Sequence, residues 1–205
     1  MSSEFCQRFS RLVLLASVTA LLASCQSAAT YSQTDQAAGP VERGRYLVTV
    51  AACNDCHTPL VMGPQGPEPD MSRTLSGHPQ DLPLGPPPLL EQGWMWGGAA
   101  SNTAFFGPWG VTYAANLTPD ENTGLGIWSE EMFLEALRTG RHMGQSRPIQ
   151  PPMPWPSYSQ MREDDLKAIY AYLRSLPAIH NRVPEYQPPT STAPDQDAAG
   201  ASSGQ

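Results

Sequence analysis

One short motif, Cys53-Asn54-Asp55-Cys56-His57, sets the expectations for the whole chain. Two cysteines separated by two residues, with a histidine directly after the second, form the covalent attachment sequence of c-type haem. Each thiol adds across one vinyl group of the porphyrin, and the two intervening residues set the reach between the two attachment points. The histidine is then held beneath the iron, where its imidazole can be an axial ligand. The motif therefore predicts one haem c bound through Cys53 and Cys56, with iron ligated by His57.

The same cysteine pair has a second reading, as a CxxC redox pair in an oxidising compartment. A thioredoxin-like domain would place a strand before the motif and a βαβ pattern around it. The residues that flank Cys53 and Cys56 show neither pattern. The histidine directly after the second cysteine has no role in a redox pair, whereas haem requires it, so we favour haem.

The N-terminus is typical of a targeting segment. Arg8 and Arg11 precede an apolar run over residues 12–22, which is too short to span a membrane comfortably. The run ends in Leu-Ala-Ser followed by Cys25, which resembles the bacterial lipoprotein box. The resemblance implies that residues 1–24 are a lipoprotein signal peptide. An ordinary signal peptide cut nearby, or an uncleaved anchor, is the alternative.

In the lipoprotein reading, Cys25 is the lipid attachment site and the protein is exported to the periplasmic side of a bacterial membrane. Gln26, in place of an aspartate, favours the outer membrane. The chain has a formal net charge of −7, which disfavours nucleic acid as a partner. We therefore expect a membrane-anchored protein that meets other proteins.

Length and composition predict one domain with extensions. The chain has 205 residues, including 22 prolines and 17 glycines, so we expect much irregular structure around a small helical core. Residues 25–38 are small and polar and read as a flexible tether. The domain is expected at 39–182. Residues 183–205 have no apolar periodicity and read as a disordered tail.

Three helices are expected. The first follows Pro40 and runs over 41–54, with Tyr46, Val50 and Cys53 on one face and Leu47 and Ala51 beside them. Gly44 is costly inside a helix, so we expect another helix to approach closely there.

The second expected helix, Glu130–Thr139, is capped by Ser129 and followed by Gly140. The third, Glu163–Leu176, has apolar residues at helical spacing and acidic residues in its first turn.

Residues 58–115 match neither regular element, because prolines and glycines interrupt every apolar period. The segment is too long for an ordinary loop and is rich in large aromatic side chains. These are Trp94, Trp96, Phe105, Phe106 and Trp109. We expect an ordered wrap over the exposed face and edge of the haem. A small aromatic core and a docking surface are the alternatives.

A second axial ligand decides between a closed and an open iron site. Met153 is our choice, because prolines on both sides hold its backbone extended and stiff. Met143 is second, and His142 is a histidine alternative. We expect His78 and His180 to be surface residues.

The ordered set of motifs resembles a class I c-type cytochrome domain over residues 41–180. More closely, it is similar to the single-haem cytochromes that accompany bacterial periplasmic or membrane-bound dehydrogenases. The matching stretches are 43–47, 53–58, 75–78, 115–120, 136–140, 153–155 and 168–177.

The resemblance implies an all-α class I cytochrome c fold, with three main helices around one covalent haem and a long irregular insertion rich in proline, glycine and aromatic residues. It implies that the first and last helices cross near Gly44 and Tyr172. It also implies Met153 as the distal ligand and a hydrogen bond from Asn116 to a haem propionate. The CxxCH motif occurs once, so a single haem is expected.

The function expected from these features is electron transfer without catalysis, because both axial positions of the iron would be filled. The donor would be a dehydrogenase, and the acceptor a quinone, another cytochrome or a terminal oxidase. A haem enzyme of the peroxidase kind is the alternative, with His142, Arg141 or Arg147 beside an open iron. A haem-based ligand sensor is a third reading, although the sequence contains no recognisable output domain.

Overall fold

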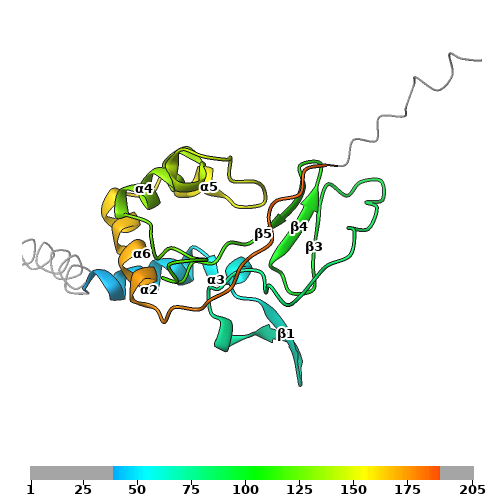
Figure 1. Ribbon diagram of the computed structural model, residues 1–205, viewed down its shortest axis with the longest axis horizontal. Helices are drawn as coiled ribbons and strands as arrows, with labels where there is room; N and C mark the ends of the chain where they lie inside the picture. Colours follow the sequence, from blue (N-terminus) through cyan, green and yellow to red (C-terminus); the bar gives the residue numbers. More distant parts are fainter. Residues whose placement is uncertain (1–38, 190–205) are drawn as a thin grey trace, which may run out of the picture.

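The computed structural model describes residues 39–189. Helices α2, α4, α5 and α6 gather on one side, the strands lie on the other, and α3 lies between them (Figure 1). The predicted signal peptide, the tether and Cys25 fall outside the described residues, as do residues 190–205 of the predicted tail.

The described chain contains five α-helices, two 3₁₀ turns and five short strands. The helices and turns are α2 (Pro40–Val50), α3 (Cys53–His57), η1 (Met71–Arg73), α4 (Glu130–Thr139), η2 (His142–Gly144), α5 (Trp155–Tyr158) and α6 (Glu163–Ser175). The strands are β1 (Leu60–Gly63), β2 (Gly66–Pro69), β3 (Gly97–Gly98), β4 (Ala104–Gly107) and β5 (Gly110–Tyr113).

The helix predicted over 41–54 is divided in two. Helix α2 ends at Val50, and Ala52 takes a left-handed conformation with φ of 58° before α3 begins. A left-handed conformation costs a residue other than glycine about 1–2 kcal/mol. Alanine gives no local signal for this break, so the surrounding contacts must impose it.

Helices α2 and α6 cross at Gly44, as predicted. A Cβ atom added to Gly44 would lie 1.9 Å from the carbonyl oxygen of Ala168 and 2.7 Å from Cβ of Tyr172. Only glycine permits this approach of two helix backbones. The adjoining core contains Leu47 and Val48 of α2.

The predicted apolar face of α2 was wrong in part. Tyr46 and Val50 are exposed, with 60% and 58% of their surface accessible, whereas Leu47 and Val48 are buried. The position of Gly44 sets the buried face of this helix, because its neighbours one turn later point the same way.

Helices α4 and α6 begin and end close to the expected residues. The side chain of Ser129 accepts a hydrogen bond from the amide of Met132, and Gly140 ends α4 with φ of 66°. Helix α6 ends at Ser175, shortly before Pro177, and has no side-chain cap at Arg162. Its buried face includes Leu166, Ile169 and Leu173.

Two small antiparallel sheets lie within the segment predicted to be irregular. Strands β1 and β2 form a hairpin, and the second sheet has the order β3-β4-β5, with Phe106 opposite Val111. Strands of four residues or fewer, interrupted by glycine and proline, leave no period long enough to read from sequence. The all-α class of the domain stays a prediction, and the two sheets lie within the insertion that was expected to be irregular.

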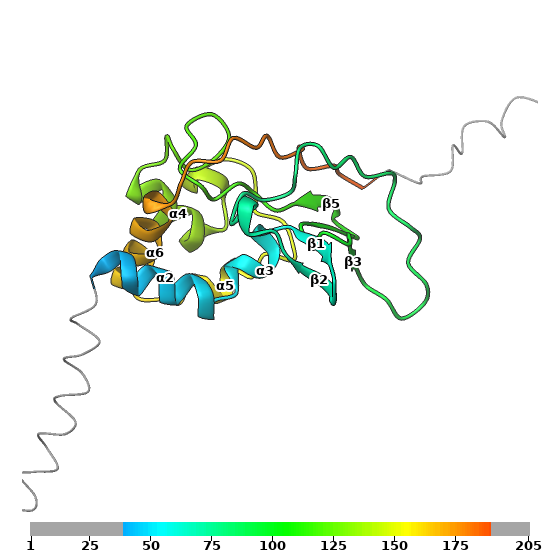
Figure 2. The same ribbon diagram turned by 90° about the horizontal axis from the view of Figure 1, so that it is seen from below.

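The predicted aromatic wrap divides into two parts. Phe105 is buried in β4, whereas every residue from 80 to 96 is exposed, including Trp94 at 71% and Leu89 at 97%. This exposed segment bows outward between η1 and β3, on the side of the molecule away from the helices (Figures 1 and 2). A docking role for it stays a prediction.

Residues after α6 form hydrogen bonds with segments from earlier in the chain. The side chain of Asn181 is buried, and its amide donates to the carbonyl oxygens of Ser76 at 2.7 Å and His78 at 2.9 Å. Gln187 pairs with Val111 through backbone hydrogen bonds of 2.8 and 2.9 Å. The ordered chain therefore continues past the boundary expected at residue 182.

An ion pair joins the two crossing helices. The carboxylate of Asp165 accepts hydrogen bonds from Nε of Arg43 at 2.8 Å and Nε of Arg162 at 3.1 Å. Burial raises the pKa of this carboxyl, but the two arginines outweigh burial, so the pKa is lowered from its usual value. A lowered pKa stabilises the fold at neutral pH and not below the folded-state pKa.

We therefore expect Asp165→Asn to lower thermal stability at pH 7 relative to the unmodified protein. The difference should shrink as the pH falls through and below about 4, the ordinary aspartate value. Thermal unfolding of both proteins across this range tests the prediction. A difference that stays constant down to about pH 2 would contradict it.

Candidate functional site

The haem-attachment motif forms α3, a helix of five residues between the break at Ala52 and Thr58. The hydroxyl of Thr58 donates to Oδ1 of Asn54 at 3.1 Å and accepts from the amide of Leu75 at 2.9 Å. These contacts connect the motif to the segment that follows η1. The short helix is thus held as a unit, with its two cysteines on one turn.

The ring of His57 is held in one orientation by a hydrogen bond. Its ring is buried, and Nδ1 lies 2.7 Å from the carbonyl oxygen of Ala115. A carbonyl can only accept, so Nδ1 carries the proton and Nε2 keeps a lone pair. Burial lowers the pKa of the imidazole, although the bond to Ala115 opposes the shift. A neutral ring with a fixed tautomer is what an iron-ligating histidine needs.

Ala115 is brought to His57 by close backbone packing. The amide of Gly77 donates to the carbonyl oxygen of His57 at 2.8 Å, and the amide of His78 donates to Ala114 at 2.9 Å. Gly77 has φ of 79°, and a Cβ atom there would lie 2.3 Å from the carbonyl oxygen of Ala114. The glycine therefore allows the segment after β5 to reach the histidine.

Cys53 and Cys56 are both partly buried and free of any disulfide. Burial raises the pKa of Cys53 to about 11 and raises that of Cys56 as well. Thiols of this kind are neutral at physiological pH. A reactive redox pair needs a lowered pKa, so the raised values disfavour that reading.

Met153 lies in the loop before α5 and packs, partly buried, against the core that also contacts Cys53. The hydroxyl of Thr112 donates to the carbonyl oxygen of Pro151 at 2.9 Å, which ties this loop to β5. Met143, the second candidate, lies in η2 with φ of 54° and is half-buried. Iron ligation by Met153 stays a prediction.

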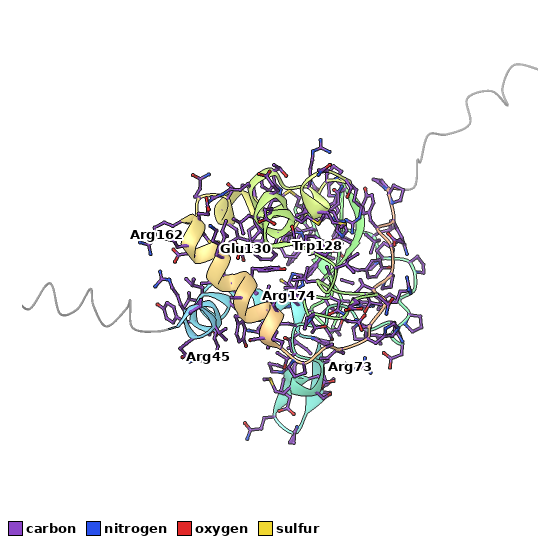
Figure 3. All side chains as sticks on the ribbon, turned by 60° about the vertical axis from the view of Figure 1, so that its left-hand side comes forward. Arg45, Arg73, Trp128, Glu130, Arg162 and Arg174 are labelled. Carbon is purple, nitrogen blue, oxygen red and sulfur yellow. The ribbon has the colours of Figure 1, made fainter. Side chains whose placement is uncertain are left out.

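His142, the histidine alternative for the second ligand, and His180, the expected surface residue, differ in environment. His142 is half-buried, and its ring meets the edge of Trp128 with centroids 4.9 Å apart. Trp128 is labelled in Figure 3. Arg174 of α6, also labelled there, donates from its guanidinium to the carbonyl oxygen of Leu125 at 2.8 Å, three residues before Trp128. His180 is exposed, as expected.

The expectation that His78 is a surface residue was wrong. The ring is fully buried, with Nδ1 at 2.9 Å from Oγ1 of Thr103 and Nε2 at 3.0 Å from the carbonyl oxygen of Leu82. Both nitrogens have a protein partner, so burial leaves no polar atom unsatisfied. The contacts of His78 fix the backbone next to Gly77, whose amide donates to the carbonyl oxygen of His57.

Asn116 is buried, and the protein occupies its whole amide. Its Nδ2 donates to the carbonyl oxygen of Ile179 at 2.8 Å and to Thr123 at 3.1 Å, while Oδ1 accepts from the amide of Thr118 at 2.9 Å. A propionate contact, which stays a prediction, would require exchange of one of these bonds. The observed contacts fix the segment that presents the carbonyl of Ala115.

The donor set fits a covalently attached haem. Two neutral thiols and one tautomerically fixed imidazole lie within a single helix, next to an apolar core. No cluster of three or more His, Cys, Asp or Glu side chains that could hold a bare metal ion occurs in residues 39–189.

Within the same residues, no helix is both long and apolar enough to cross a membrane.

Sequence reasoning missed the carbonyl of Ala115 and the scaffold around Gly77 and His78. Residues 75–78 were among the stretches that resemble the cytochrome family, but the resemblance did not indicate what these residues do.

Comparison with known proteins finds cytochrome subunits of bacterial dehydrogenases. The chain is 28% identical over 181 residues to the cytochrome c subunit of a quinone-dependent alcohol dehydrogenase from Gluconobacter oxydans, which covers 86% of this chain and 30% of the relative. It is 28% identical over 159 residues to the gluconate 2-dehydrogenase cytochrome c subunit of Pantoea cypripedii, covering 78% of this chain and 28% of that one.

A third relative is the fructose dehydrogenase cytochrome subunit of Gluconobacter japonicus, 28% identical over 133 residues, or 65% of this chain and 20% of the relative. The chain thus spans less than a third of the length of these relatives. No family model matches it. By their names, all three of these relatives are cytochrome subunits of dehydrogenases.

Proposed function

We propose that this chain is a single-haem c-type cytochrome of the class I fold that carries electrons from a dehydrogenase to the respiratory chain. The observation that carries the proposal is the fixed tautomer of His57, held by Ala115 in the same short helix as two cysteines that form no disulfide. Similarity to dehydrogenase cytochrome subunits agrees with it.

Each residue of the site has a defined task in this proposal. Cys53 and Cys56 bind the haem through thioether bonds, and His57 ligates the iron on one side. The haem supplies one-electron chemistry when bound. The hydrogen bond from Nδ1 of His57 to the carbonyl oxygen of Ala115 keeps the ring in place. It also makes Nε2 more basic and so a stronger iron ligand. Met153 completes the axial pair and closes the iron to outside ligands.

The partner in this proposal is a dehydrogenase subunit, as the names of the relatives suggest. The acceptor is a quinone, another cytochrome or a terminal oxidase. Cys25 is the lipid attachment site, which confines the protein to the periplasmic surface of a membrane, with the outer membrane favoured by Gln26. The protein itself catalyses no reaction on a substrate.

The first test is the absorption spectrum of the purified haem-loaded protein, oxidised and reduced, with and without carbon monoxide. We expect a low-spin c-type spectrum that carbon monoxide leaves unchanged, because both axial positions are filled. Rapid carbon monoxide binding to the ferrous protein would contradict the proposed ligation. In that case a peroxidase-like enzyme or a haem-based sensor becomes the better reading.

A further inference from the structure

One hydrogen bond connects the segment that carries Met153 with the segment that carries the haem motif. The phenol of Tyr158, the last residue of α5, donates to the carbonyl oxygen of Ala51 at 2.7 Å. Ala51 lies two residues before Cys53, and Tyr158 lies five residues after Met153. The bond therefore joins chain regions 107 residues apart in sequence.

The acceptor lies at the break between α2 and α3. A helix that ends leaves its last carbonyl oxygens without helical donors. Ala51 is the C-terminal cap of α2, and the left-handed Ala52 follows it. Tyr158 supplies a donor at this point, so the same hydroxyl that anchors α5 also fixes the backbone that leads into Cys53.

Two other contacts hold the segment around Met153 and α5, residues 151–159, to other elements. Thr112 of β5 donates to Pro151, two residues before Met153. A guanidinium nitrogen of Arg138, on α4, donates to the carbonyl oxygen of Ser159. Tyr158 differs from both, because its bond runs to the haem-attachment side of the domain.

The ring of Tyr158 belongs to the same packed region as Cys53 and Met153. Burial raises the pKa of its phenol to about 12, so the hydroxyl stays a donor at physiological pH. Burial of the ring also restrains the side chain.

We infer that Tyr158 is a positioning residue, which holds the Met153 loop against the haem-attachment helix and thereby keeps the methionine on the iron. The inference rests on the proposed His57 and Met153 ligation. It assigns Tyr158 no contact with the haem itself. Its effect is on how readily another ligand displaces the methionine.

The test is the affinity of the ferric, haem-loaded protein for imidazole, which competes with a methionine ligand. In Tyr158→Phe the ring and its packing remain, and only the hydroxyl is lost. We expect covalent haem content to be unchanged and imidazole affinity to rise about fivefold, as loss of one buried hydrogen bond implies. An affinity equal to that of the unmodified protein would overturn the inference.

Tyr170→Phe is the matched control. Tyr170 is also partly buried, and its phenol donates to the carbonyl oxygen of Trp128 at 2.6 Å, away from Met153 in sequence. We expect a similar loss of thermal stability from both variants, with imidazole affinity unchanged in Tyr170→Phe. Equal rises in affinity in the two variants would show a general loosening and would also overturn the inference.

A double variant separates this inference from the proposed ligation. If Met153 is the ligand, Met153→Ala raises imidazole affinity by itself, and adding Tyr158→Phe changes it no further. If Met153→Ala leaves the affinity unchanged, the proposed ligation is wrong. If Met153→Ala raises it while Tyr158→Phe does not, the ligation stands and the positioning role alone fails.

Discussion

Replacement of Met153 by alanine is expected to leave the haem covalently attached while opening the iron to added ligands. Attachment depends on Cys53 and Cys56, which lie in a different segment from the methionine loop. The ferrous variant should bind carbon monoxide with a complete change of its absorption spectrum, whereas the unmodified protein should not respond. Loss of the thioether should also lower the reduction potential, because methionine ligation raises it.

Met143→Ala is the control for this result. Met143 is the second candidate in the sequence and is half-buried in η2. We expect that variant to ignore carbon monoxide as the unmodified protein does. An unchanged spectrum in Met153→Ala would show that Met153 is not the iron ligand. Carbon monoxide binding in Met143→Ala instead would assign that role to Met143.

Replacement of Gly44 by alanine is expected to destabilise the domain strongly. The added Cβ atom would lie 1.9 Å from the carbonyl oxygen of Ala168, which is backbone and cannot turn aside. The helices α2 and α6 would have to separate, at a cost of about 3 kcal/mol, the upper part of the range for overpacked cores. Thermal unfolding of the haem-loaded variant measures the loss, expected at roughly 6–12 °C.

Gly85→Ala provides a matched control for this substitution. A Cβ atom added at Gly85 would have no heavy atom within 4 Å, and its φ lies outside the left-handed range. The melting temperature of this variant should stay within about 1–2 °C of the unmodified protein. Equal stability of the Gly44 and Gly85 variants would mean that α2 and α6 do not pack this closely.

The parts of the fold that sequence predicted are those with strong local signals. Ser129 and Gly140 mark the ends of α4, and Pro177 follows α6 closely, because capping and proline chemistry act within a few residues. Gly44 was informative for another reason. A glycine inside a good helix is unfavourable locally, so its presence indicated a tertiary contact.

The parts that sequence could not predict depend on contacts between distant residues. Nothing near Ala52 announces a left-handed turn, and the backbone oxygen of Ala115 has no side-chain signature at all. His78 looked like a surface residue because its partners, Thr103 and the carbonyl of Leu82, are brought to it only by folding. The role of Tyr158 likewise has no local signal, because its acceptor, the carbonyl of Ala51, is 107 residues away in sequence.

The segment after α6 has a consequence for the order in which the molecule is completed. Ile179, Asn181 and Gln187 hydrogen-bond to parts of the chain made much earlier, including the residue next to Ala115. Since a chain is synthesised from its N-terminus, the cysteine motif emerges while these later residues are still missing. If the chain binds haem as proposed, the two cysteines would be accessible before the segment after α6 makes its contacts.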